Sequence, residues 1–163
     1  MKTKKLIIVT TAYPYGKGES FLQAELAHIS KHFEGIELVP CIYRTSTQSR
    51  SPEHEVNLAY ASKRWSALRK FLMIASFAGA LWQYKWLKDL LHILRRPHKF
   101  ENAKELARAL YRAKLFESFL RDHIVKKKNE LDLVYFYWLT PEIMGAIAFR
   151  DRFKPSLKIV SRA

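Results

Sequence analysis

The chain has a single cysteine among its 163 residues, so it has no partner thiol for an internal disulfide bond. Cys41 lies in an apolar run, which favours a small buried residue over a nucleophile and is consistent with a reducing compartment. Long apolar runs are also scarce. The longest, Phe71 to Trp82, is shorter than the ~20 residues that a membrane-spanning helix needs. The run Leu6 to Val9 behind the basic N-terminus is too short for a signal peptide.

Common signatures of cofactor binding and catalysis are missing as well. The first strand is not followed by Gly-x-Gly-x-x-Gly, which weakens a dinucleotide-binding interpretation, and no Walker A loop or Gly-x-Ser-x-Gly elbow occurs. The six histidines do not show a usual zinc spacing. His28 and His32 fall one helical turn apart, but no carboxylate completes a metal-binding pattern. We therefore predict no metal site and no cofactor in this chain.

Acidic residues are few, with 15 Asp and Glu against 29 Lys and Arg, a net charge of +14 and a pI near 10.0. Such a balance favours an anionic partner, which leaves nucleic acid, acidic lipid or a phosphorylated substrate. A merely solvated basic surface explains the charge equally simply. Charge alone does not choose among these partners.

Strand and helix patterns alternate along the chain. Apolar or β-branched runs predict strands at Lys5–Thr11, Ile36–Tyr43, Leu131–Trp138 and Leu157–Ser161, with a short further strand at Val56–Tyr60. Helical spacing predicts helices at Glu19–Lys31, at Asn102–Lys128 and after Thr140, with Thr140 as the cap and Pro141 at the first position. The order predicts one α/β domain over residues 1–163, Rossmann-like, with a mostly parallel sheet and helices on both faces.

The loop after the first predicted strand, Tyr13 to Glu19, is the strongest candidate site, because ligands of open α/β sheets bind at the carboxyl ends of strands. Gly16 and Gly18 allow close backbone approach and positive φ, and Lys17 adds a positive charge. Free N–H groups at the following helix start can bind a phosphate or a sugar hydroxyl. Glu19 either accepts hydrogen bonds from sugar hydroxyls or is a favourably placed acid at a helix N-terminus.

Two stretches of the chain carry a resemblance to a known family. The first is Thr11-Ala12-Tyr13-Pro14-Tyr15-Gly16-Lys17-Gly18-Glu19-Ser20-Phe21-Leu22, with Glu25 beyond it. The second is Tyr135-Phe136-Tyr137-Trp138-Leu139-Thr140-Pro141-Glu142, then Gly145-Ala146 and Val160-Ser161-Arg162-Ala163. In this order they resemble the N-terminal domain of glycosyltransferase family 4 enzymes, which have the GT-B fold and build bacterial surface polysaccharides such as lipopolysaccharide. Together the two stretches bracket nearly the whole chain.

The resemblance implies the acceptor-binding half of a retaining, metal-independent hexosyltransferase that moves a sugar from a nucleotide-sugar to a lipid-linked saccharide. In that family a strand ending like Ser161-Arg162-Ala163 leads into a His-Gly pair, whose histidine lies at the active site. We therefore expect no catalytic residue in this chain, a truncation before the donor-binding C-terminal domain, and no transfer activity from this chain alone. The implied substrate-binding residues are Gly16, Lys17, Gly18, Glu19 and Trp138, although Trp138 also fits a plain core position.

The resemblance also suggests a role for residues 62–96, a basic helical segment rich in aromatic residues. It either covers the sheet or lies on an anionic membrane surface, and we favour the membrane because its flanking charges are nearly all basic. The expected membrane-contact residues are Trp65, Lys70, Trp82, Lys85 and Trp86. This predicts a cytoplasmic protein, peripheral on the inner face of the cell membrane.

The alternative function is a basic α/β module that binds nucleic acid, with aromatic rings stacked on bases. The aromatic residues cluster in apolar runs rather than in a basic surface motif, which makes nucleic acid the less favoured partner. A receiver-like regulator fits less well, because Thr10, Thr11 and Ala12 occupy the place of its acidic cluster.

Overall fold

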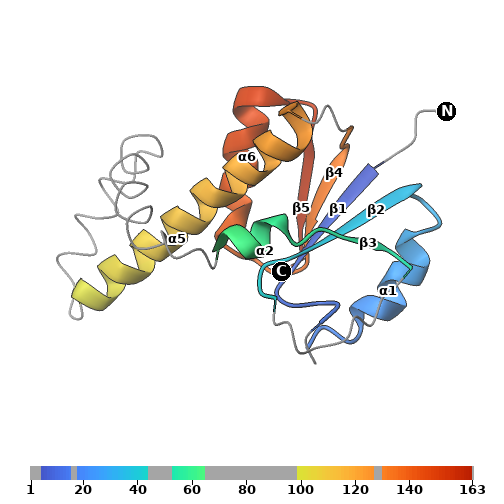
Figure 1. Ribbon diagram of the computed structural model, residues 1–163, viewed down its shortest axis with the longest axis horizontal. Coiled ribbons are helices and arrows are strands. Elements are labelled where there is room, and N and C mark those ends of the chain that lie inside the picture. The colour runs from blue at the N-terminus through green and yellow to red at the C-terminus, as the bar shows by residue number, and fades with distance from the viewer. Residues whose placement is uncertain (1–4, 16–17, 44–52, 65–98, 127–129, 163) are drawn as a thin grey trace.

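The computed structural model describes residues 5–15, 18–43, 53–64, 99–126 and 130–162. Its strands form one sheet in the order β3-β2-β1-β4-β5, and every neighbouring pair is parallel (Figure 1). The strands are β1 (Lys5–Thr10), β2 (Gly35–Pro40), β3 (Glu55–Val56), β4 (Leu133–Phe136) and β5 (Lys158–Ser161). The parallel α/β sheet predicted from the alternating pattern is confirmed.

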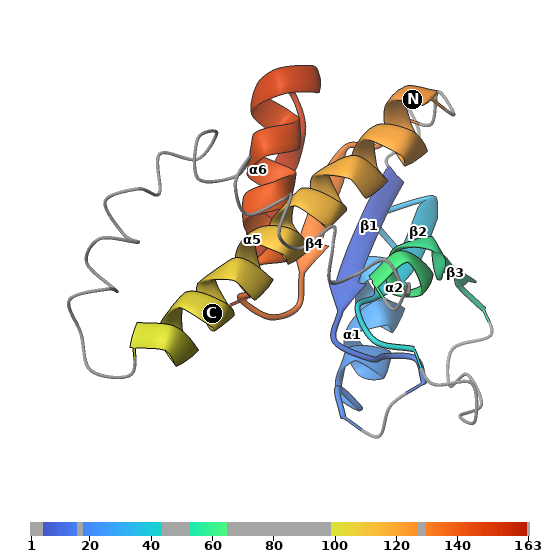
Figure 2. The same cartoon turned by 60° about the vertical axis from the view of Figure 1, so that its left-hand side comes forward.

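Helices cover both faces of this sheet. They are α1 (Leu22–Ile29), α2 (Ala59–Arg64), α5 (Lys99–Leu120), its π-helical continuation η1 (Arg121–Lys126) and α6 (Glu142–Phe153). Leu6 and Ile8 of β1 pack with α1, whereas Ile7 and Val9 pack with α5 and α6 on the opposite face. Both views show α6 beside α5 (Figures 1 and 2). A central strand buried on both faces explains why the apolar residues of β1 are consecutive, and the arrangement is Rossmann-like.

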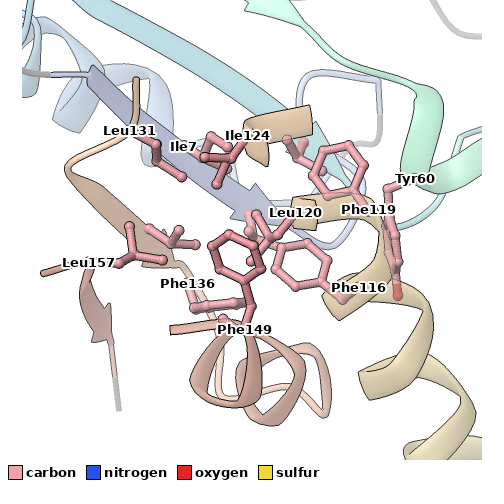
Figure 3. Packing of buried hydrophobic residues seen from close by; sticks show 14 of the residues in the cluster. Ile7, Tyr60, Phe116, Phe119, Leu120, Ile124, Leu131, Phe136, Phe149 and Leu157 are labelled. Carbon is pink, nitrogen blue, oxygen red and sulfur yellow. The ribbon is translucent and has the colours of Figure 1, made fainter. Parts of the chain in front are cut away.

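The larger core cluster lies on the α5 and α6 face and is rich in aromatic rings (Figure 3). Phe116 of α5 contacts Tyr60 of α2 and Phe136 of β4, with ring centroids 5.2 and 5.5 Å apart. At Gly145 of α6 an added Cβ would lie 2.1 Å from the Ala113 carbonyl oxygen, so the two helices cross in close contact. These contacts fix α2, α5 and α6 relative to one another.

The predicted end of one strand is wrong. The strand expected at Val56–Tyr60 ends at Val56, and a helix begins at Ala59. The Asn57 side chain accepts a hydrogen bond from the Ala59 N–H (2.9 Å), a local contact that competes with the strand and turns the chain. Ser62, expected to open the basic segment, belongs to the same helix α2. Most of residues 62–96, including Trp65, Lys70, Trp82, Lys85 and Trp86, lies outside the described residues.

Helix starts also differ from expectation. α1 begins at Leu22 rather than Glu19, and Glu19 has a φ of 59°, outside the helical range. The Thr140 side chain makes no capping hydrogen bond to α6, and Pro141 occupies the N-cap position. The Thr140 carbonyl oxygen instead accepts the Ile143 N–H (3.1 Å). In the part of the chain that the structure describes, no helix is long and apolar enough to span a bilayer.

Candidate functional site at the carboxyl edge of the sheet

The loop after β1 folds around the side chain of Glu19. One carboxylate oxygen accepts the Thr11 N–H (2.9 Å), and the other accepts the N–H groups of Ala12 (3.1 Å) and Tyr13 (3.0 Å). Glu19 is only 7% exposed. Its left-handed backbone costs on the order of 1 kcal/mol, which these hydrogen bonds offset. We call this arrangement the Glu19 bracket, comprising residues 11–13 and Glu19.

Trp138 joins the Glu19 bracket from the other end of the sequence. Its indole N–H donates to the same Glu19 oxygen that accepts the Thr11 N–H, at 2.9 Å. The ring follows β4 and is 44% exposed, so the plain core position considered for Trp138 is wrong. The carboxyl ends of β1 and β4 are therefore tied together beside an exposed aromatic ring.

Arg162 ties the end of β5 to the same region. Its guanidinium donates to the Tyr137 hydroxyl (3.0 Å) and pairs with the Glu25 carboxylate of α1. It also lies over the rings of Phe21 and Tyr137, 5.7 and 5.4 Å from their centroids. This cluster lies at the carboxyl end of the strands, because Tyr137 directly follows β4 and Arg162 directly follows β5.

The predicted loop residues have different outcomes. Gly16 and Lys17 lie outside the described residues. Gly18 is exposed, has no positive φ, and an added Cβ there would meet nothing within 4 Å. Glu19 lies just before the N-terminus of α1, where its carbonyl oxygen accepts the Leu22 N–H (3.1 Å), but its carboxylate accepts three N–H groups of the loop after β1. The three N–H groups and the Trp138 indole surround the Glu19 carboxylate, so this side chain fixes the shape of the loop.

The sequence did not predict a second buried carboxylate, that of Glu142. It begins α6 and is fully buried. Arg112 of α5 donates from Nε to one oxygen (2.9 Å) and from Nη2 to the other (2.8 Å), and the Tyr60 hydroxyl donates at 2.6 Å. A glutamate after proline at a helix start is ordinary, so no local signal predicts partners 30 and 82 residues away.

The surroundings of Glu142 shift several pKa values. Burial by itself would raise the Glu142 pKa, but the hydrogen bonds and charge of Arg112, with the Tyr60 hydrogen bond, hold it below its ordinary value. The pKa of Tyr60 and that of the Cys41 thiol are raised well above their ordinary values, first by burial and then by the Glu142 charge. Cys41 is 2% exposed, which confirms the prediction of a small buried residue.

Arg64 lies beside Glu142, between this buried carboxylate and solvent. Its guanidinium lies 3.9 Å from Glu142 and donates to the Cys41 carbonyl oxygen (3.1 Å). Beside it is a cavity of about 240 Å³, which we call the arginine cavity; its described lining residues are Arg64, Glu105, Arg108, Tyr111 and Arg112. The segments that carry Cys41, Arg64 and Glu142 follow the carboxyl ends of β2, β3 and β4, the edge where ligands of such sheets bind.

A larger cavity, about 450 Å³, lies at the opposite, amino edge, lined in part by Lys5 and Gly35 at the starts of β1 and β2. It is acidic, and the His123 Nε2 pairs there with Glu37 at 2.9 Å. Within the described ranges, no group of three or more histidine, cysteine, aspartate or glutamate side chains is placed to hold a metal ion. The carboxyl edge is the candidate site because ligands of open α/β sheets bind at the carboxyl ends of the strands.

Comparison of the chain with protein-family models, with curated proteins and with solved structures finds no match. A functional interpretation therefore depends on the residues and their geometry.

Proposed function

We propose that this chain is the acceptor-binding N-terminal domain of a retaining glycosyltransferase, which transfers a sugar from a nucleotide-sugar to a lipid-linked saccharide. One observation carries the proposal. The stretches that resemble the family meet at a single edge of the sheet, through the Glu19–Trp138 hydrogen bond across 119 residues and the Arg162–Glu25 pair across 137. The parallel order of β1, β4 and β5 already brings these segments to one edge, so the support comes from the specific side-chain contacts that join the two stretches there.

The exposed groups at this edge suit a saccharide. Trp138 is 44% exposed and Phe21 is 49% exposed, with ring centroids 6.5 Å apart. The negative face of an aromatic ring attracts the polarised C–H groups of a pyranose ring. The Glu19 bracket holds the Trp138 indole in one orientation, so the acceptor would be positioned rather than activated. The positive groups that stabilise a departing diphosphate would come mostly from a second domain.

The test is binding of polyprenyl-diphosphate-linked N-acetylglucosamine in detergent, with the sugar-free polyprenyl diphosphate as the lipid control. We expect the saccharide ligand to bind more tightly, and Trp138→Ala to weaken that binding by about two- to tenfold, since an aromatic contact contributes ~0.5–1.5 kcal/mol. Phe153→Ala is the matched control, because Phe153 is equally exposed (45%) but lies at the end of α6.

Equal binding of the two ligands, or equal losses in the two variants, would contradict the proposal. Tight binding of a random oligonucleotide that weakens steeply with salt, without binding to the saccharide, would favour the nucleic-acid alternative.

A further inference from the structure

The arginine cavity holds more positive than negative charge. Three guanidinium groups, those of Arg64, Arg108 and Arg112, share its described walls with one carboxylate, Glu105. Glu142, behind the wall, accepts both hydrogen bonds from Arg112 and lies 3.9 Å from Arg64. Three cations therefore face two carboxylates.

This excess positive charge is partly withdrawn from water. The side chains of Arg64 and Arg112 are only 16% and 26% exposed. A guanidinium that has lost part of its hydration has an unfavourable free energy unless an anion compensates it. An anion that enters the cavity would compensate the excess positive charge. The low dielectric of the surrounding walls would strengthen its attraction to the guanidinium groups.

The donors in this cavity are held in place before any ligand arrives. Glu142 holds Arg112 in a two-point contact, and the Cys41 carbonyl oxygen fixes Arg64 at 3.1 Å. The planar fork of arginine matches the oxygen spacing of a phosphate group. Glu105, the one carboxylate in the lining, pairs with Arg108 and is 67% exposed, so it can turn toward solvent when an anion binds.

We propose that the arginine cavity binds a phosphate-bearing anion, a phosphate monoester or a diphosphate, between α2 and α5. Its volume of about 240 Å³ has room for such a group in place of several water molecules. The proposal is separate from the saccharide site, because it uses none of the residues of the Glu19 bracket and holds whether or not the chain belongs to a glycosyltransferase.

The experiment titrates the chain with sodium pyrophosphate and with inorganic phosphate, at an ionic strength that screens exposed charges. We expect both to bind, pyrophosphate more tightly. Arg108→Gln should weaken pyrophosphate binding by about tenfold, as for loss of a charge-assisted hydrogen bond, and Arg108→Lys by less. Arg108 is 41% exposed and pairs with exposed Glu105, so its replacement should leave the fold intact.

Arg152→Gln is the matched control. Arg152 is 45% exposed and pairs with Glu117 of α5, which Lys114 also contacts, outside the cavity. Unchanged affinity in this variant supports a defined site. Absence of pyrophosphate binding to the unaltered chain, or equal losses in Arg108→Gln and Arg152→Gln, would overturn the proposal.

The anion has two possible sources, a free phosphorylated metabolite or a lipid headgroup. Phosphatidylcholine vesicles with and without phosphatidylglycerol separate them once pyrophosphate binding is established. If pyrophosphate displaces the chain from the anionic vesicles, and Arg108→Gln binds them less well than Arg152→Gln, the cavity takes a lipid phosphate. If vesicle binding is the same in both variants, or does not occur, the cavity takes a free phosphate compound.

Discussion

Glu19 and Glu142 are both buried glutamates at the carboxyl edge of one sheet, yet their partners differ in kind. Glu19 accepts hydrogen bonds from three backbone N–H groups and an indole, all neutral. Glu142 accepts from a guanidinium and a phenol, and a second guanidinium lies 3.9 Å away.

The difference shows two ways to keep a carboxylate inside a protein. Dipoles from a folded loop compensate Glu19, and the same hydrogen bonds give that loop its shape. A charge on another helix compensates Glu142, and that ion pair links α5 to α6. Glu19 therefore organises a local segment, whereas Glu142 organises the packing of distant ones.

The largest effect is expected from Arg112→Leu, which removes both charged hydrogen bonds of Glu142. The carboxylate would remain buried with its closest cation gone, and the free energy of unfolding should fall by about 3 kcal/mol, measured by urea denaturation. The double variant Arg112→Leu/Glu142→Gln should recover part of the loss, because no buried charge is left without compensation. If the single and double variants are equally stable, the ion pair is not what stabilises this region.

The next effect belongs to Glu19. Glu19→Ala leaves three backbone N–H groups and the indole without their acceptor, and should lower the free energy of unfolding by about 2 kcal/mol. Glu19→Gln should cost less, because an amide oxygen still accepts from neutral donors. Glu142→Gln should cost more than Glu19→Gln, since Arg112 loses an anionic partner. The reverse order would contradict the contrast between the two glutamates.

Acid should reduce the contribution of Glu142 to the free energy of unfolding. The folded state holds the pKa of Glu142 below its ordinary value, so the ionised carboxylate stabilises the fold above the pKa of the unfolded chain. That contribution is lost as the pH falls through the lower, folded-state pKa. We therefore expect the stability difference between the unaltered chain and Glu142→Gln to be constant near neutral pH and to shrink on acidification. Urea denaturation at a series of pH values measures it, and an unchanged difference in acid would exclude this linkage.

The smallest effect is expected on the reactivity of the Cys41 thiol, which is buried near Glu142. Its burial and raised pKa predict slow reaction with a thiol reagent in the native chain and fast reaction after unfolding. Arg112→Leu should accelerate the native reaction and Glu19→Ala should not, as monitored by mass spectrometry. Equal acceleration in both variants would show that the two regions loosen together.

Local patterns predicted the central part of the fold well. The consecutive apolar residues from Leu6 to Val9 predicted a strand buried on both faces, and β1 is that strand. The prediction failed at residues 56–60, where a local side-chain contact of Asn57 turns the chain into a helix. The length of β3 depends on its pairing with the neighbouring strand. A pattern of two or three residues does not specify that pairing.

The candidate site was predicted less completely. The position of the loop after β1 follows from the topology of α/β sheets. Sequence spacing left two possible roles open for Glu19 and two for Trp138. It could not choose between them, because the hydrogen bond that joins these side chains links residues 119 positions apart. The arginine cavity was missed because Arg64, Arg108 and Arg112 belong to two helices whose side-by-side packing is set by the aromatic core.

The sequence by itself determined the class of fold and the parallel direction of the strands, because these follow from hydrophobic periodicity and the order of elements. Only the tertiary structure decided which donors compensate Glu19 and Glu142. A carboxylate can be buried only where enough donors converge on it, and these donors are brought together by the packing of segments distant in the chain.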